Sequence, residues 1–140
     1  MIPRLPLILA LGLAAAAPAG AADGPAGRYA LDVDATYQKL VAAGNVDPKA
    51  RSLLEQAKAL LVLVFQNSTV SFVSGAAQGS KVSGTCSWRL AGTAIQLSQC
   101  QSATPGTPFN FTGTLSFDAA ANAVAVSGAK AKAPVIYRAE

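Results

Sequence analysis

The segment GTCSWRLAGTAIQLSQC, residues 84–100, contains two runs of alternating residues on either side of Ala91-Gly92. In each run apolar side chains occupy every second position, which is typical of a β-strand with one buried face. A short glycine-containing pair between two such runs indicates a hairpin turn. A two-residue turn at this pair places Trp88 opposite Ile95, on the face that we expect to be buried.

The same alternation continues through most of the chain. In FNFTGTLSF, residues 109–117, large apolar side chains lie on one face of the strand and polar side chains on the other. Segments rich in glycine, proline, asparagine or serine separate these runs, as turns do. The pattern predicts eight strands, at residues 28–33, 61–66, 69–75, 82–90, 93–99, 109–117, 122–128 and 134–138.

A helical insertion at about 35–60 separates the first two strands. Asp34 is a candidate N-cap for a short helix, 35–43, because its side chain can accept a free N–H of the first turn. Asp47 followed by Pro48 marks the start of a second helix, since proline lacks only a donor that would have no partner there.

Eight consecutive antiparallel strands can bury a shared apolar face by closing on themselves, which also removes exposed edges. We therefore predict a mainly β fold, an eight-stranded antiparallel up-and-down barrel or half-open barrel, formed by residues 22–140 as a single domain. Two questions stay open. Residues 61–65 fit either a strand or a continuation of the second helix, and a barrel of this size is either filled by side chains or holds one small ligand.

The N-terminus has the three parts of a secretory signal peptide. Arg4 supplies the positive charge, residues 5–17 form the apolar run, and Ala19-Gly20-Ala21 supplies the small residues before a cleavage site. The apolar run is shorter than the roughly 20 residues of a membrane-spanning helix. We expect residues 1–21 to be removed, and the rest to be periplasmic or secreted with no membrane span.

Export would place Cys86 and Cys100 in an oxidising compartment, where two cysteines usually pair. The sequence therefore predicts a disulfide between them. In a regular ladder the side chain of Cys86 lies on the inner face with that of Trp88. The side chain of Cys100 lies on the outer face with that of Ser98, because residues two apart on a strand share a face. The bond therefore requires a β-bulge or a strand end between Leu97 and Cys100.

Composition argues against catalysis and against metal or cofactor binding. The chain has no histidine, so it lacks the commonest general base and the commonest metal ligand. Two cysteines cannot complete a thiolate zinc site, and no pair of acidic residues lies in an apolar setting. The formal charge of +4 is scattered over the chain, without the clustered basic stripe of a nucleic-acid-binding protein. We expect no enzyme activity, no cofactor, no metal site and no nucleic-acid partner.

Three residues resemble conserved features of lipocalins and related calycins, which open their first strand with Gly-x-Trp and place an arginine from the chain's end over that indole. Gly27, Tyr29 and Arg138 match these positions, with tyrosine in place of tryptophan. The resemblance implies that these residues close the barrel. The chain is also similar to a group of functionally uncharacterised exported bacterial β-barrel proteins, through Gly27, Tyr29, Leu31, Asp32 and then Gly84, Trp88, Leu90, Gly92, Ile95 and Leu97.

These observations lead to two functional hypotheses. The first is a non-enzymatic binding module whose barrel holds a small apolar or amphipathic ligand. Its candidate interior contacts are aromatic: Tyr29, Phe72, Trp88, Phe109, Phe111 and Phe117. The second is a protein-interaction module of the cell envelope, such as a hydrolase inhibitor or an assembly factor, acting through the loop 101–108. We expect a monomer in either case.

Overall fold

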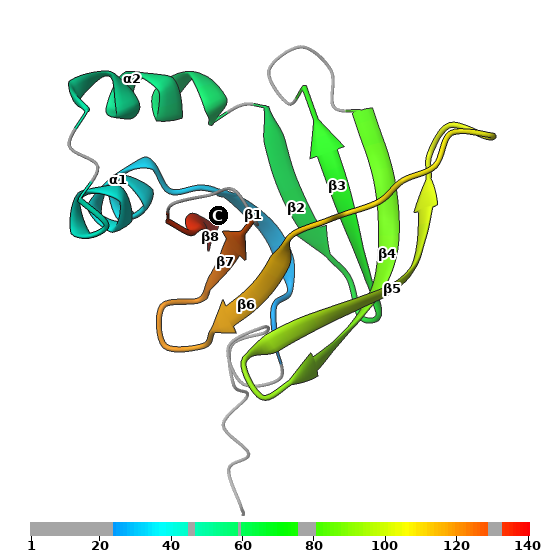
Figure 1. Ribbon diagram of the computed structural model, residues 1–140. Coiled ribbons are helices and arrows are strands. Elements are labelled where there is room, and N and C mark those ends of the chain that lie inside the picture. The colour runs from blue at the N-terminus through cyan, green and yellow to red at the C-terminus, as the bar shows by residue number, and fades with distance from the viewer. Residues whose placement is uncertain (1–23, 45–46, 59, 76–80, 129–132) are drawn as a thin grey trace, which may run out of the picture.

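A computed structural model describes residues 24–44, 47–58, 60–75, 81–128 and 133–140 of this chain. It shows a closed barrel of eight antiparallel strands with two helices on its outside (Figure 1). The strands are β1 (Gly27–Leu31), β2 (Leu61–Phe65), β3 (Thr69–Ser74), β4 (Lys81–Ala91), β5 (Ala94–Ser102), β6 (Thr114–Asp118), β7 (Ala123–Ser127) and β8 (Val135–Ala139). The predicted up-and-down barrel is confirmed. The predicted signal peptide, residues 1–21, lies outside the described residues.

The barrel closes where the first strand meets the last. β1 pairs antiparallel with β8, with Ala30 opposite Arg138 and Leu31 opposite Tyr137. The Nε atom of Arg28 lies 2.8 Å from a carboxylate oxygen of Glu140, which adds an ion pair at the same seam. Each strand therefore has a neighbour on both sides, as a closed barrel requires.

Residues 61–65 form a strand and do not extend the second helix. Leu63 lies opposite Tyr29 of β1 on one side and opposite Phe72 of β3 on the other. Its side chain is fully buried. The β-branched and aromatic residues of this segment suit a pleated, half-buried surface better than a helix.

Helix α1 (Val33–Ala42) begins earlier than predicted, because Asp32 and not Asp34 is its N-cap. The Asp32 backbone N–H still donates to the carbonyl of Ile136 in β8, at 2.8 Å, while its carboxylate accepts the N–H of Ala35 at 2.9 Å. One residue thus ends the strand and starts the helix. Helix α2 (Pro48–Ala57) begins as predicted, with the Asp47 carboxylate accepting a backbone N–H of its first turn.

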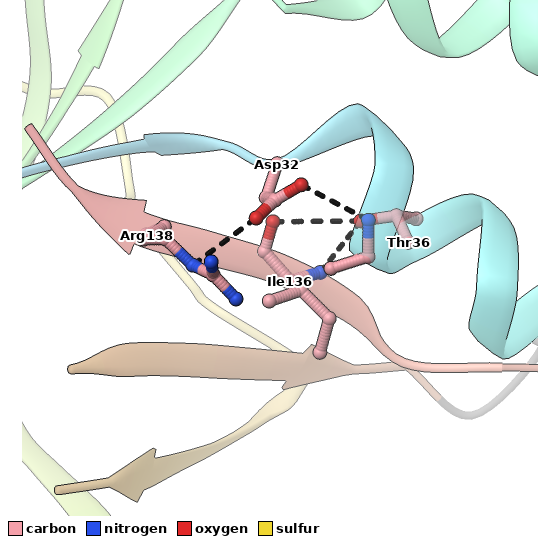
Figure 2. Close-up of polar contacts among 5 residues, drawn as sticks. Asp32, Thr36, Ile136 and Arg138 are labelled. Carbon is pink, nitrogen blue, oxygen red and sulfur yellow. Dashed lines mark hydrogen bonds and ion pairs between the residues drawn. The ribbon is translucent and has the colours of Figure 1, made fainter. Parts of the chain in front are cut away.

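A buried threonine holds α1 against β8, next to the end of β1 (Figure 2). The Thr36 hydroxyl accepts the backbone N–H of Ile136 at 2.9 Å and donates to its carbonyl at 3.4 Å. Helix α2 packs on α1, where Arg51 pairs with Asp34 and lies 5.7 Å from the centre of the Tyr37 ring. The helical insertion therefore packs beside β8, and Val33, Leu54 and Ala57 contact the hydrophobic core of the barrel.

The hairpin of β4 and β5 turns one residue later than predicted. Leu90 lies opposite Ile95 and Trp88 opposite Leu97, so the turn residues are Gly92 and Thr93. Gly92 has a φ of +64°, and glycine is favoured at the first central position of a type II′ hairpin turn. The backbone preference of this glycine explains the shift.

The disulfide between Cys86 and Cys100 is present, and it lies at the predicted irregularity. The register of β4 and β5 shifts at this point, so that Gln99 and Cys100 together lie opposite Cys86. Gln99 adopts a left-handed φ of +50°, as an extra residue in a bulge can. The bulge turns Cys100 to the inner face, where it packs against the core that contains Cys86.

Strand β6 is shorter than the predicted strand 109–117. It begins at Thr114, and β5 pairs with it only at Ala94 and Ile95. Just before this strand, Gly113 lies so close to β7 that a Cβ there would be 2.8 Å from the carbonyl oxygen of Ser127. The residues before Gly113 are not part of the sheet.

Candidate functional site

The six aromatic residues predicted to line the barrel all pack within its core. Tyr29, Phe72 and Phe117 are buried, and the other three are partly buried against the same cluster. Trp88 contacts Phe65 edge-on, with ring centres 5.6 Å apart, and donates its indole N–H to the carbonyl of Gln66 at 3.1 Å. These side chains behave as core residues.

The rings form two groups inside the barrel, and within each group the rings contact one another. Phe65 joins Trp88 to Tyr29, whose ring centre lies 5.5 Å away. At the other group, Phe72 lies 5.2 Å from both Phe109 and Phe111. Edge-to-face and tilted contacts at these distances are favourable aromatic packing. The rings thus occupy interior space that a ligand would need.

The three residues that resemble the lipocalin closure lie in different environments. Gly27 begins β1 with a φ of +85°, and Tyr29 lies inside the barrel. Arg138 shares the outer face with Ala30, its partner in β1, and binds Asp32 at 3.1 Å. The strands that carry these residues do close the barrel, but Arg138 lies on the opposite face of the sheet from Tyr29.

Two tyrosine hydroxyls lie in the core. Tyr29 donates to the side-chain oxygen of Asn122 at 2.6 Å and accepts the N–H of Ala26 at 3.3 Å. Burial raises the pKa of Tyr29, which the hydrogen bond from Ala26 partly offsets. Burial also raises the pKa of Tyr137. These hydroxyls are therefore neutral near pH 7 and serve as structural groups.

A groove of about 750 Å³ lies outside the barrel, over β7. The outward residues of β7 that line it are Ala123 and Ala125, and longer outward side chains of the neighbouring strands stand on both sides. Ser116 and Asp118 form the wall on β6, and Ile136 and Arg138 form the wall on β8. The groove exists because the middle strand presents only methyl groups between two strands with longer side chains.

Helix α1 extends the β8 wall of this groove. Ala35 and Lys39 are one helical turn apart and both line it, while Thr36 holds the helix against β8 (Figure 2). The groove is also lined by the turn between β6 and β7 and by Leu90 and Gly24. The groove is thus apolar along its floor, with Lys39 and Arg138 in its α1–β8 wall and Asp118 in its β6 wall.

A smaller hollow, of about 320 Å³, lies beside the same seam. It includes Asp32 and Arg138, which already pair with each other, and also Glu55 and Lys58. Its charges are of both signs, so it offers no clear preference for a ligand.

The described residues give little support for other chemistry. They contain no group of three or more histidine, cysteine or acidic side chains placed to hold a metal ion. No helix among them is long and apolar enough to cross a membrane.

Sequence reasoning missed the groove. The available signal was the run AVAVS at 123–127, whose alternate alanines leave one face of a strand without bulk. The alanines indicate a groove only when the position of α1 is also known, because α1 contacts β8 and leaves the outer face of β7 uncovered.

Comparison of the chain with models of protein families, with curated proteins and with solved structures found no match.

Proposed function

We propose that this protein is an exported, non-enzymatic binding module, and that its ligand is a small amphipathic molecule held in the groove over β7. The observation that carries the proposal is the groove itself. Its volume of about 750 Å³ falls within the range of roughly 300–1,000 Å³ of small-molecule sites. An apolar floor with a few charged groups at one side is the usual chemistry of such sites.

The location differs from what a lipocalin-like resemblance implies. A ligand inside the barrel would compete for space with the aromatic rings grouped around Phe65 and Phe72. Displacing packed core side chains costs several kcal/mol, on the order of a core truncation. A ligand over Ala123 and Ala125 displaces only solvent.

The other parts of the proposal rest on the sequence and on the disulfide. The Cys86–Cys100 bond suits an oxidising compartment, which is where the predicted signal peptide would deliver the chain. The absence of histidine from the whole chain supports a role in binding over one in catalysis.

Native mass spectrometry of protein purified from the envelope of expressing cells tests this proposal. We expect a copurifying small molecule that is lost from the variant Ala125→Trp, in which an indole fills the groove. Ser98→Trp is the matched control, because Ser98 is an outward position on a strand, as Ala125 is, but does not line the groove. A small molecule retained equally by both variants would place the site elsewhere, and protein free of any ligand would contradict the proposal.

An interaction module remains the second candidate, favoured by one feature of β5. Beyond Ile95, this strand has no partner from β6, so among the described residues its outer edge carries unpaired backbone groups. The following segment, Ala103 to Pro108, is exposed throughout and projects from the barrel (Figure 1). An exposed edge accepts an extended segment of another protein. A protein copurifying in fixed stoichiometry in the same experiment would favour this candidate.

A further inference from the structure

The charged groups that line the groove over β7 differ in how fully their charges are compensated. Asp118 accepts the backbone N–H groups of Ala120 and Ala121, at 3.1 and 3.3 Å. Arg138 binds the Asp32 carboxylate. Within the described part of the chain, no hydrogen bond or ion pair engages the ammonium group of Lys39. Among the described residues that line the groove, Lys39 is thus the cation whose charge is available to pair with an anionic ligand.

The position of Lys39 places that charge at one end of an apolar surface. It stands on the exposed side of α1, one turn after Ala35, and both residues line the groove. Arg138 lies in the same wall, on β8. Across the groove the register aligns Arg138 with Ala123 and Ala123 with Asp118. Arg138 and Asp118 therefore lie on opposite walls, about two strand spacings or roughly 10 Å apart.

We propose that the ligand of this groove is an amphiphile with a single carboxylate, its head held by Lys39 beside Arg138 and its apolar chain laid over Ala123 and Ala125. This inference rests on the proposed function and specifies its ligand class. An anion gains a modest Coulomb energy at the Lys39 wall, of the size that an exposed ion pair supplies. The chain removes alanine and Ile136 surface from water, which is favourable in proportion to the area buried.

The charge count favours one negative charge over two. Asp32 already neutralises the charge of Arg138. Lys39 can therefore balance one negative charge on a ligand. The Asp118 carboxylate on the far wall would repel a second negative charge and would repel a head placed at that wall. A monocarboxylate therefore fits better than a dianionic phosphate, and it fits in one orientation.

Titration calorimetry with three eight-carbon probes separates the contributions of head and chain. The probes are octanoate, 1-octanol and octylamine, which are anionic, neutral and cationic at neutral pH. We expect octanoate to bind about threefold to fivefold more tightly than octanol, the range that a partly exposed ion pair supplies. Added salt should narrow this preference, because it screens exposed charges.

The variants Lys39→Gln and Lys49→Gln identify the group responsible. Lys39→Gln should bind octanol as before and lose the preference for octanoate. Lys49→Gln is the control, because Lys49 is an exposed lysine on α2 that does not line the groove. It should keep the preference unchanged.

The possible failures are distinguishable. If octanol and octanoate bind equally, or if octylamine binds best, the anionic head is wrong while the groove remains a binding site. If a preference for octanoate survives Lys39→Gln, the assigned head position is wrong. If none of the three probes binds, the proposed function fails together with this inference.

Discussion

The Tyr29 hydroxyl inside the barrel donates to the Asn122 side chain at 2.6 Å, across 93 positions of sequence. Asn122 ends the turn between β6 and β7 and has a left-handed φ of +47°. The bond thus ties the first strand to a turn that borders the groove. The same hydroxyl accepts the N–H of Ala26, so it also fixes the chain that enters the barrel.

Tyr29→Phe should lower the free energy of unfolding by about 1–3 kcal/mol, because it leaves two partly buried polar groups without their partner. Urea unfolding measures the change. Asn122→Gly keeps the left-handed turn and removes the same bond, so the double variant should lose less than the sum of the two single variants. Additive losses would show that Tyr29 and Asn122 do not interact energetically.

Stability should fall as pH rises above about 10, the pKa of an unperturbed tyrosine. Burial raises the pKa of Tyr137 and of Tyr29 in the folded protein. The unfolded chain therefore releases these protons first, and the stabilisation present below pH 10 is lost as pH increases. Tyr137→Phe should make this decline shallower while leaving stability near pH 7 almost unchanged. An unaltered slope would contradict the assignment to Tyr137.

The barrel could be predicted because alternation is local: each strand shows its buried face within a few residues. The bulge before Cys100 could be predicted for the same reason. A regular ladder would place Cys86 and Cys100 on opposite faces of the sheet, where they could not form a disulfide. The loss of strand at 109–113 could not be predicted, because the alternation of apolar and polar residues in the sequence continues unbroken through Phe109 and Phe111.

The groove could not be predicted for a related reason. The alanines of β7 are visible in the sequence, but they form a groove only because α1 covers β8 and leaves β7 open. The position of α1 depends in turn on the hydrogen bonds between Thr36 and Ile136, which are 100 residues apart. Asp32 and Asp34 are both good N-caps, and contact with β8 selects Asp32.

Thr36→Val should weaken the docking of α1, because valine has nearly the same shape but cannot bond to Ile136. The buried N–H of Ile136 would lose its partner, at a cost of about 1–3 kcal/mol. Hydrogen exchange should show faster exchange of the Ile136 amide. Thr36→Ser keeps the hydroxyl and should protect this amide far better. Equal exchange in both variants would mean that the hydroxyl does not hold the helix.

Removal of the disulfide by Cys86→Ala with Cys100→Ala should lower the unfolding free energy by roughly 3 kcal/mol, from the loop-closure entropy of a loop of this length. The comparison is urea unfolding of the native protein with and without a thiol reductant. The reductant should shift the native protein toward the double variant and leave the double variant itself unchanged. If reduction leaves the native midpoint in place, the bond does not stabilise the fold.

Gly84→Ala tests how tightly the second aromatic group is packed. A Cβ at Gly84 would overlap the base of the Phe109 ring, where the side chain has little freedom to move. We expect a loss of about 1–3 kcal/mol, as for other overpacked cores. Adding Phe109→Leu should recover part of that loss, although Phe109→Leu alone destabilises the native protein. Compensation of this kind, measured as a positive coupling in a double-mutant cycle, requires that Phe109 pack directly on Gly84. Simple additivity would mean that the ring lies elsewhere.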